Sequence, residues 1–206
     1  MREDISQGLG DTWAAAIGLI PLGLAFGLLM VQPGFSWWWT PIFSIVIYAG
    51  SMEFLAISMV TGGATAVASL VTGFMVNFRH IFYGLTFPRH RIHSRVGRAY
   101  STYALTDETY AIVSSLPAEE RPSGNRILTI QIFCQVLWVG GGIVGALAGR
   151  VIPSSVPGME FALVALFVVL AMDSFRNNQD FSLPLSAVVV GILAAAFAPG
   201  QLLMVA

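Results

Sequence analysis

Long stretches without a charged residue or a histidine determine how this chain is organised. Such stretches run over 12–52, 54–78, 127–149 and 181–206. A membrane-spanning helix needs about 20 mainly apolar residues, and glycine-containing turns at 32–34 and 61–63 divide the longer stretches. The pattern therefore predicts an all-α, polytopic membrane helix bundle. Its six or seven transmembrane segments are expected near 13–31, 41–60, 63–86, 99–116 (the uncertain one), 127–149, 158–173 and 181–206.

The composition favours lipid as the solvent of this chain. Of its 206 residues, 56% are hydrophobic and 10% are charged, and the mean hydropathy is +0.76, whereas soluble domains carry about 25% charged residues. Three consecutive tryptophans, Trp37 to Trp39, fit a membrane–water interface. The start of the chain lacks the features of a cleavable signal peptide, so we expect the first apolar segment to be retained in one transmembrane domain over 1–206.

Basic residues gather in one short segment. Arg89, Arg91, Arg95 and Arg98 lie within ten residues, and the positive-inside rule places such a segment in the cytoplasm. Counting back from it over simple helical hairpins puts the N-terminus outside the cell. One re-entrant segment would reverse that orientation.

Two of the predicted segments are interrupted near their middles. Pro21 lies in the first, flanked by glycines, and Gly50 and Ser51 lie in the second, just before Glu53. Breaks in membrane helices leave backbone groups that protein or a water-filled cavity must satisfy, and transporters use such broken helices to bind substrates and ions. For Pro21, a simple kink is the alternative interpretation.

Other glycines recur at the spacing of helix–helix packing. Gly141, Gly145 and Gly149 are separated by four residues each, as are Gly23 and Gly27. Small residues at this spacing let two membrane helices approach closely. These glycines are therefore predicted to pack helices together rather than to carry chemistry.

Glu53 is the most informative single residue, because it lies inside an apolar segment. A charged side chain at the centre of a membrane helix costs about 2.5–3.5 kcal/mol on insertion scales, so it usually pairs or lines a cavity. A helix break at Gly50-Ser51 would place Glu53 in the first turn of a half-helix, where the helix dipole offsets part of that cost. The functional hypothesis is a proton carrier or a ligand for a substrate ammonium group. The alternative is a segment that enters the membrane only partway, with Glu53 in water.

Asn77, Arg79 and His80 close the third segment. The amide of Asn77 can tie helix backbones together or take part in transport. The Arg79 side chain can extend along the apolar surface and place its charge among the lipid headgroups, which is the structural alternative to a functional role.

Asp107 and Glu108 lie within the polar segment 99–116. On one continuous helix, spacings of three and four residues would put Asp107 on the same face as Tyr103, Tyr110 and Ser114. Asp107 would then sit among hydroxyl groups on a wet surface or a cavity wall. On a cytoplasmic helix, both acids would be ordinary solvated charges.

Several classes of chemistry lack the residues that they need. The sequence contains no CxxC, HExxH or GxSxG pattern and no phosphate-binding glycine loop, and its net charge of −1 gives no sign of a nucleic-acid partner. The one cysteine, Cys134, rules out a disulfide within the chain. We expect no cofactor, no metal and no enzymatic activity.

Five sequence strings, in order along the chain, resemble the AzlC family of bacterial membrane proteins. They are GLIPLGLAFG, YAGSMEFLAISM, NFRHIFYGL, ALTDETYAIV and MEFALVALFVVLAMD. The resemblance implies the large subunit of a branched-chain amino acid exporter in the bacterial inner membrane, working with a small AzlD-type membrane subunit. It also implies a further membrane segment and a polar tail beyond Ala206.

The resemblance carries site residues to matching positions of this sequence. Gly50, Ser51 and Glu53 match a glycine–small–polar motif, in which the family often has glutamine at the position of Glu53. The other matches are to an Asn-x-Arg-His motif and a Thr-Asp-Glu motif, at Asn77, Arg79, His80, Asp107 and Glu108. With Pro21, these residues form the expected pathway for substrate or protons.

The leading hypothesis is a secondary transporter that exports leucine, isoleucine or valine, with methionine as a further candidate, driven by the proton gradient. The half-helix end after Gly50 would bind the carboxylate of the amino acid, and Glu53 or Asp107 would bind its ammonium group. Two alternatives remain at this stage: a membrane scaffold that positions a small partner, and an intramembrane enzyme using Glu53, Asp107 and His80.

Overall fold

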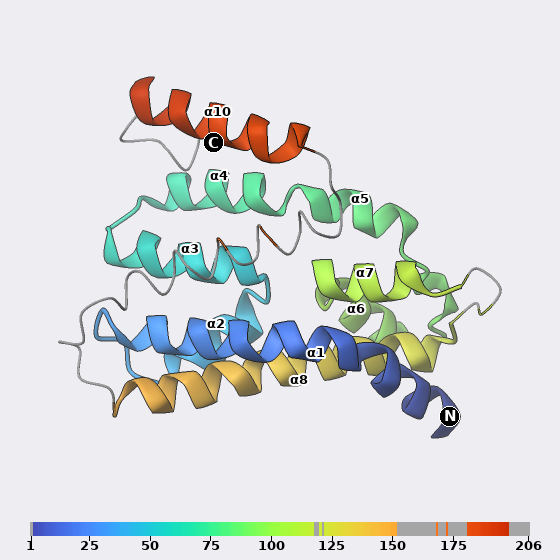
Figure 1. The fold of residues 1–206 in the computed structure, drawn as a ribbon. Helices are drawn as coiled ribbons and strands as arrows, with labels where there is room; N and C mark the ends of the chain where they lie inside the picture. The colour runs from blue at the N-terminus through green and yellow to red at the C-terminus, as the bar shows by residue number, and fades with distance from the viewer. Residues whose placement is uncertain are drawn as a thin grey trace. The chain divides into compact units, whose positions relative to one another are not determined.

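The computed structural model describes residues 2–117, 120, 122–151, 168, 172 and 181–197. Within these residues the chain is helical and contains no strand (Figure 1). The helices are α1 (Arg2–Val31), α2 (Trp39–Val46), α3 (Gly50–Thr61), α4 (Ala66–Asn77), α5 (Arg79–Thr86), the short 3₁₀ helix η1 (Arg89–Arg91), α6 (Arg95–Tyr103), α7 (Asp107–Ser115), α8 (Gly124–Gly149) and α10 (Ser182–Phe197). The predicted all-helical architecture is confirmed for this part of the chain.

The chain divides into two compact units, each described by itself. One unit comprises 1–65 and 76–154, and the other comprises 66–75 and 155–206. The second unit contains most of α4 and all of α10. The predicted segment 158–173 lies outside the described residues except for Val168 and Met172, and the prediction of a single domain stays a prediction. All candidate site residues described below, including Asn77 at the end of α4, belong to the first unit.

Helices α1 and α8 form the frame of the first unit and pack along each other through glycines. A Cβ atom added to Gly27 would overlap the carbonyl oxygen of Gly142, and one added to Gly145 would overlap the carbonyl oxygen of Leu24. At Gly23 it would lie 2.8 Å from the Trp138 carbonyl oxygen. The close backbone approach predicted from the glycine spacing is therefore confirmed.

Helix α8 is the one described helix that is long and apolar enough by itself to cross a membrane. Within α1, Arg2–Trp13 and Ala15–Val31 qualify together as one span with a 65° bend. The helix begins well before the predicted boundary at 13 and continues through Pro21, whose side chain is exposed. Pro21 therefore does not divide this helix. The number of membrane spans stays a prediction.

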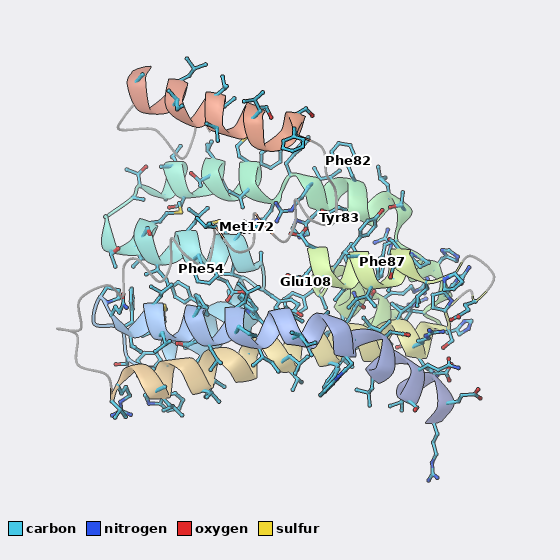
Figure 2. The ribbon with its side chains drawn as sticks, viewed as in Figure 1. Phe54, Phe82, Tyr83, Phe87, Glu108 and Met172 are labelled. Carbon is cyan, nitrogen blue, oxygen red and sulfur yellow. The ribbon has the colours of Figure 1, made fainter. Side chains whose placement is uncertain are left out.

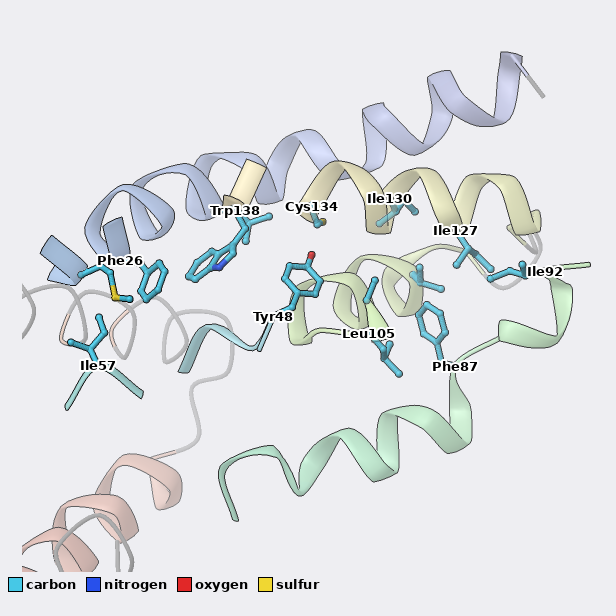
Figure 3. Close-up of a cluster of buried hydrophobic side chains, with 14 residues drawn as sticks. Phe26, Tyr48, Ile57, Phe87, Ile92, Leu105, Ile127, Ile130, Cys134 and Trp138 are labelled. Atoms are coloured by element: carbon cyan, nitrogen blue, oxygen red, sulfur yellow. The ribbon is translucent and has the colours of Figure 1, made fainter. Parts of the chain in front are cut away.

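The predicted span 41–60 consists of two short helices that fold back on each other (Figure 1). Helix α2 starts where Thr40 faces Gly142 of α8, and Ile45, near its end, contacts Tyr103. The backbone turns at Tyr48, which has φ +43°, and α3 runs back so that Ile57 lies on the side of Phe26 (Figure 3). The break therefore falls just before Gly50 rather than at Gly50-Ser51. We call α2 and α3 the first hairpin.

The predicted segment 99–116 is also broken. Helix α6 begins at a cap in which the Gly97 N–H donates to the Ser94 hydroxyl at 3.3 Å, and it ends at Tyr103. Helix α7 begins at Asp107 with a capping box between Thr106 and Thr109. The prediction that one helix places Tyr103 and Asp107 on the same face is wrong, because the chain turns between them. We call α6 and α7 the second hairpin.

The N-terminus lies at the same end of the first unit as the arginine-rich segment. Ser123, next to α8, donates to an Asp4 carboxylate oxygen at 2.5 Å, and a Cβ atom on Gly124 would lie 2.5 Å from the Arg91 carbonyl oxygen. Counting simple hairpins put these two parts of the chain on opposite sides of the membrane, whereas the structure brings them together at one end of the unit. The count fails because the first hairpin enters and leaves at one end of the unit (Figure 1).

Candidate functional site

The turns of the two hairpins border one small cavity in the first unit. Its volume is about 20 Å³, which is room for a single water molecule. A leucine side chain does not fit in this volume. The lining residues are Leu19, Tyr48, Gly50, Glu53, Thr106, Glu108, Cys134 and Trp138.

Glu53 is fully buried at this cavity and is held by neutral donors. The Ser44 hydroxyl donates to Oε2 at 2.9 Å, and the Trp138 indole N–H lies 3.0 Å from both carboxyl oxygens. Among the ion pairs of the described residues, none includes Glu53. A buried carboxyl group with neutral donors and no cation on it can accept either a proton or a cationic ligand.

Trp138 is fixed in an aromatic slot beside Glu53. Its ring stacks against Phe26 with centroids 6.2 Å apart and meets Phe54 edge-on at 6.4 Å. A Cβ atom on Gly50 would lie 3.2 Å from the indole ring, so the missing side chain at Gly50 lets α3 approach it. Figure 3 shows Trp138 between Phe26 and Tyr48. The same ring therefore fills the space next to the carboxyl group and donates to it.

The second helix of each hairpin begins at the cavity, but the N-caps of these two helices differ. The N-cap of α3 is Ala49, which offers no side-chain cap, whereas the N-cap of α7 is satisfied by its own threonines. Each helix nonetheless brings a carboxyl group in its first turn, Glu53 from α3 and Glu108 from α7. Figure 2 shows Glu108 at the inner end of α7. The uncapped N–H groups at the start of α3 are suited to an anionic group of a ligand.

Tyr103 joins the two hairpins next to the cavity. Its hydroxyl donates to the carbonyl oxygen of Ile45 in α2 and accepts from the Gln135 amide of α8 at 2.8 Å. Its ring lies 5.6 Å from that of Tyr48, at the turn of the first hairpin. This contact must break if the hairpins separate.

Tyr103→Phe is expected to open the cavity more often, because it removes the hydrogen bond between the hairpins. The buried thiol of Cys134 reports on this opening. We expect a small thiol reagent to label Cys134 about fivefold faster, as the loss of one hydrogen bond implies. Tyr100→Phe is the matched control, because the Tyr100 hydroxyl also donates to Gln135, at 2.7 Å, and among the described residues it makes no hydrogen bond to the first hairpin. Equal labelling rates in both variants would contradict the role of Tyr103.

The structure brings only some of the predicted site residues together. Gly50, Glu53 and Glu108 meet at the cavity, whereas Ser51 and Pro21 are exposed. Asp107 instead pairs with Arg79, whose Nε donates to Oδ1 at 2.9 Å and whose Nη2 donates to Oδ2 at 2.5 Å.

Asn77 and His80 lie at the junction of α4 and α5. The Asn77 side chain is half-buried, and the backbone carbonyl oxygen of Asn77 lies 3.1 Å from His80 Nδ1. This contact holds the His80 imidazole against the end of α4, next to Arg79 at the start of α5. Neither residue is among those that line the cavity.

Trp138, Ser44 and Tyr48 belong to the site, although the sequence analysis did not single them out. Trp138 carried a usable signal, because tryptophan favours membrane interfaces and this one lies in the middle of an apolar segment. Ser44 and Tyr48 gave no comparable signal. Their roles follow from the turn between α2 and α3, which composition does not reveal.

These features define an all-helical membrane protein with a buried polar site between two broken-helix hairpins. The sequence model of the AzlC family, described as AzlC protein, matches residues 14–152. The chain belongs to the AzlC family, and the resemblance inferred from its motifs is confirmed.

Similar proteins come from several bacteria. The Escherichia coli inner membrane protein YgaZ is 32% identical over 197 residues, which cover 91% of this chain and 79% of that protein. The Bacillus subtilis branched-chain amino acid transport protein AzlC is 29% identical over 164 residues, 79% of this chain and 64% of that protein. An uncharacterized Helicobacter pylori membrane protein is 28% identical over 186 residues, 90% of this chain and 82% of that protein. No solved structure matches the chain at a significant level.

Proposed function

We propose that this protein is the large subunit of a secondary transporter that exports branched-chain amino acids across the bacterial inner membrane. The observation that carries the proposal is the buried, unpaired Glu53 carboxyl group between two broken-helix hairpins. Family membership and the name of the Bacillus subtilis relative support amino-acid transport. The protein is a multi-pass transporter in this proposal rather than an enzyme, and a small AzlD-type subunit is its partner.

The polar groups at the cavity match the two charged ends of an amino acid. The uncapped start of α3 at Ala49 and Gly50 suits the carboxylate. The carboxyl groups of Glu53 and Glu108 suit the ammonium group. Apolar side chains around Trp138, among them Phe26 and Phe54, suit an aliphatic side chain.

Transport requires the closed cavity to open toward each side in turn. The first hairpin is anchored at the end of the unit away from the arginine-rich segment, and the second is anchored near that segment. Movement of the second hairpin would open the site toward the cytoplasm, and movement of the first would open it to the other side. Such alternating access around a fixed site is typical of secondary transporters.

Proton coupling is part of the proposal and depends on Glu53. When the carboxyl group is protonated it no longer attracts the ammonium group, so proton entry from outside would release the substrate there. The negative carboxylate would bind the next substrate from the cytoplasm. Glu108 lies at the same cavity and is the second group able to hold this proton.

Glu53→Gln is expected to remove the pH dependence of leucine counterflow in liposomes while keeping an acceptor for Trp138. Leucine affinity should fall about tenfold or more, because an amide replaces a charge-assisted acceptor. Glu3→Gln, at an exposed position in the first turn of α1, is the matched control and should behave as the unmodified protein.

The assay also tests the alternatives when it is run with and without the small subunit. Leucine flux by the chain alone would exclude the scaffold hypothesis, and flux only with the partner would support a two-subunit transporter. An absence of leucine binding and flux in both preparations would refute the proposed function. An unchanged pH profile in Glu53→Gln would refute the role of Glu53 in coupling.

A further inference from the structure

In the closed state, the group that would bind the substrate ammonium is covered by a side chain of the protein itself. The Trp138 N–H points at both oxygens of Glu53, at 3.0 Å each. We propose that this N–H occupies the position that the substrate ammonium group takes on binding, so that Trp138 competes with the substrate for Glu53. The inference rests on the proposed function and specifies how its site discriminates between ligands.

The dimensions of the site support displacement rather than addition. With the indole in place, the free volume is about 20 Å³, which a water molecule fills and an amino acid does not. The Ser44 hydroxyl already takes one oxygen of Glu53. A ligand that reaches this carboxyl group must therefore move a side chain, and Trp138 is the largest side chain that lines the cavity.

The space that the indole would vacate has the chemistry of an aliphatic side-chain pocket. It is bordered by the rings of Phe26 and Phe54 and lies directly beside the carboxyl group. A ligand with an ammonium group next to an aliphatic chain replaces both parts of Trp138, the N–H and the apolar ring. The expected class is thus amino acids with free ammonium groups and aliphatic side chains, and the corresponding keto acids are excluded.

The competing interpretation is that Trp138 only buttresses Glu53 and stays bonded to it in every state. The two interpretations predict opposite effects for Trp138→Phe, which keeps an aromatic ring and removes the N–H. If Trp138 competes with the ligand, the loss of its hydrogen bond leaves Glu53 free, so leucine should bind about tenfold more tightly. If Trp138 only supports Glu53, the loss of its hydrogen bond leaves the leucine affinity unchanged or lowers it.

The affinity is measured by equilibrium binding of leucine to the purified full chain with its small subunit. Trp39→Phe is the matched control, because Trp39 is exposed and stacks on Trp38 away from the cavity, and it should leave the affinity unchanged. Tighter binding in Trp138→Phe alone supports the proposal. Unchanged or weaker binding in that variant overturns it.

A second measurement keeps the native Trp138 and so does not depend on that variant folding. A chain with Trp13, Trp37, Trp38 and Trp39 replaced by Phe reports the fluorescence of Trp138 alone. Leucine should shift its emission to longer wavelength as the indole leaves the apolar slot, and the keto acid of the same skeleton should not. Leucine binding without an emission change overturns the proposal but leaves the proposed function standing. No leucine binding to the unmodified protein overturns the proposed function itself.

Discussion

Gly27→Ala is expected to prevent α1 and α8 from packing and to abolish the folded protein. The added methyl carbon would lie 1.9 Å from the carbonyl oxygen of Gly142 and 2.5 Å from the Ala146 nitrogen. Both are backbone atoms inside a helix, so no side-chain rotation can relieve the overlap. Overpacking of a core typically costs about 1–3 kcal/mol and sometimes more. Here α1 and α8 would have to separate along the whole line of close glycine contacts at Gly23, Gly27, Gly141 and Gly145, which we call the glycine seam.

The measurement is the yield of monodisperse protein in detergent together with its thermal unfolding midpoint. Gly18→Ala is the matched control in the same helix, because nothing lies within 4 Å of the added carbon. It should be neutral or stabilising, since alanine is favoured over glycine in a helix by about 1 kcal/mol. In α8, Gly145→Ala and Gly140→Ala form the same kind of pair. Similar midpoints for Gly27→Ala and Gly18→Ala would contradict the packing described here.

The glycine seam was predictable from sequence because its cause is local and periodic. A four-residue spacing places glycines on one helix face whatever the rest of the chain does. The buried environment of Glu53 was predictable for a related reason, since a single acid in a long apolar stretch must find a polar site. In both cases the sequence identifies the residue, and only the structure shows which residue it contacts.

The hairpins were not predictable from the apolar pattern. The segment 41–60 is long and apolar enough for a span, and the turn falls at Tyr48, a residue type that rarely adopts positive φ. The obvious breaker, Gly50, instead became the first residue of α3. In the second hairpin, the capping box uses Thr109 where the usual signature has Glu or Gln. Chain direction at both turns is therefore set by tertiary packing.

Pairs far apart in sequence were beyond prediction from one chain. Glu53 and Trp138 are separated by 85 positions, and Asp11 and Arg126 by 115. No periodicity links such residues, and only the packing of separate helices brings them together; α1 and α8 run parallel, with Gly8 beside Thr129 and Gly27 beside Gly142. Arg126 lay just outside a predicted span and gave no sign that it was buried.

Arg126→Ala is expected to lower the free energy of unfolding by about 3–5 kcal/mol, the cost of breaking a buried ion pair by removing one partner. Arg126 is 7% exposed. Its Nε and Nη2 donate to the two oxygens of Asp11 at 2.6 and 2.9 Å, and its Nη1 donates to Glu120 at 2.8 Å. The variant leaves the Asp11 carboxylate in the α1–α8 contact without its cation. Reversible unfolding in mixed micelles measures the loss.

Arg150→Ala, at the exposed C-cap of the same helix, should change the free energy of unfolding little. The double variant Asp11→Leu with Arg126→Met separates charge from packing. If the cost arises from the uncompensated carboxylate, removing both charges should restore most of the stability. A double variant as unstable as Arg126→Ala would mean that the guanidinium itself holds α1 against α8. The packing of the N-terminal part of α1 against α8 would then depend on the Asp11–Arg126 ion pair as well as on the glycine seam.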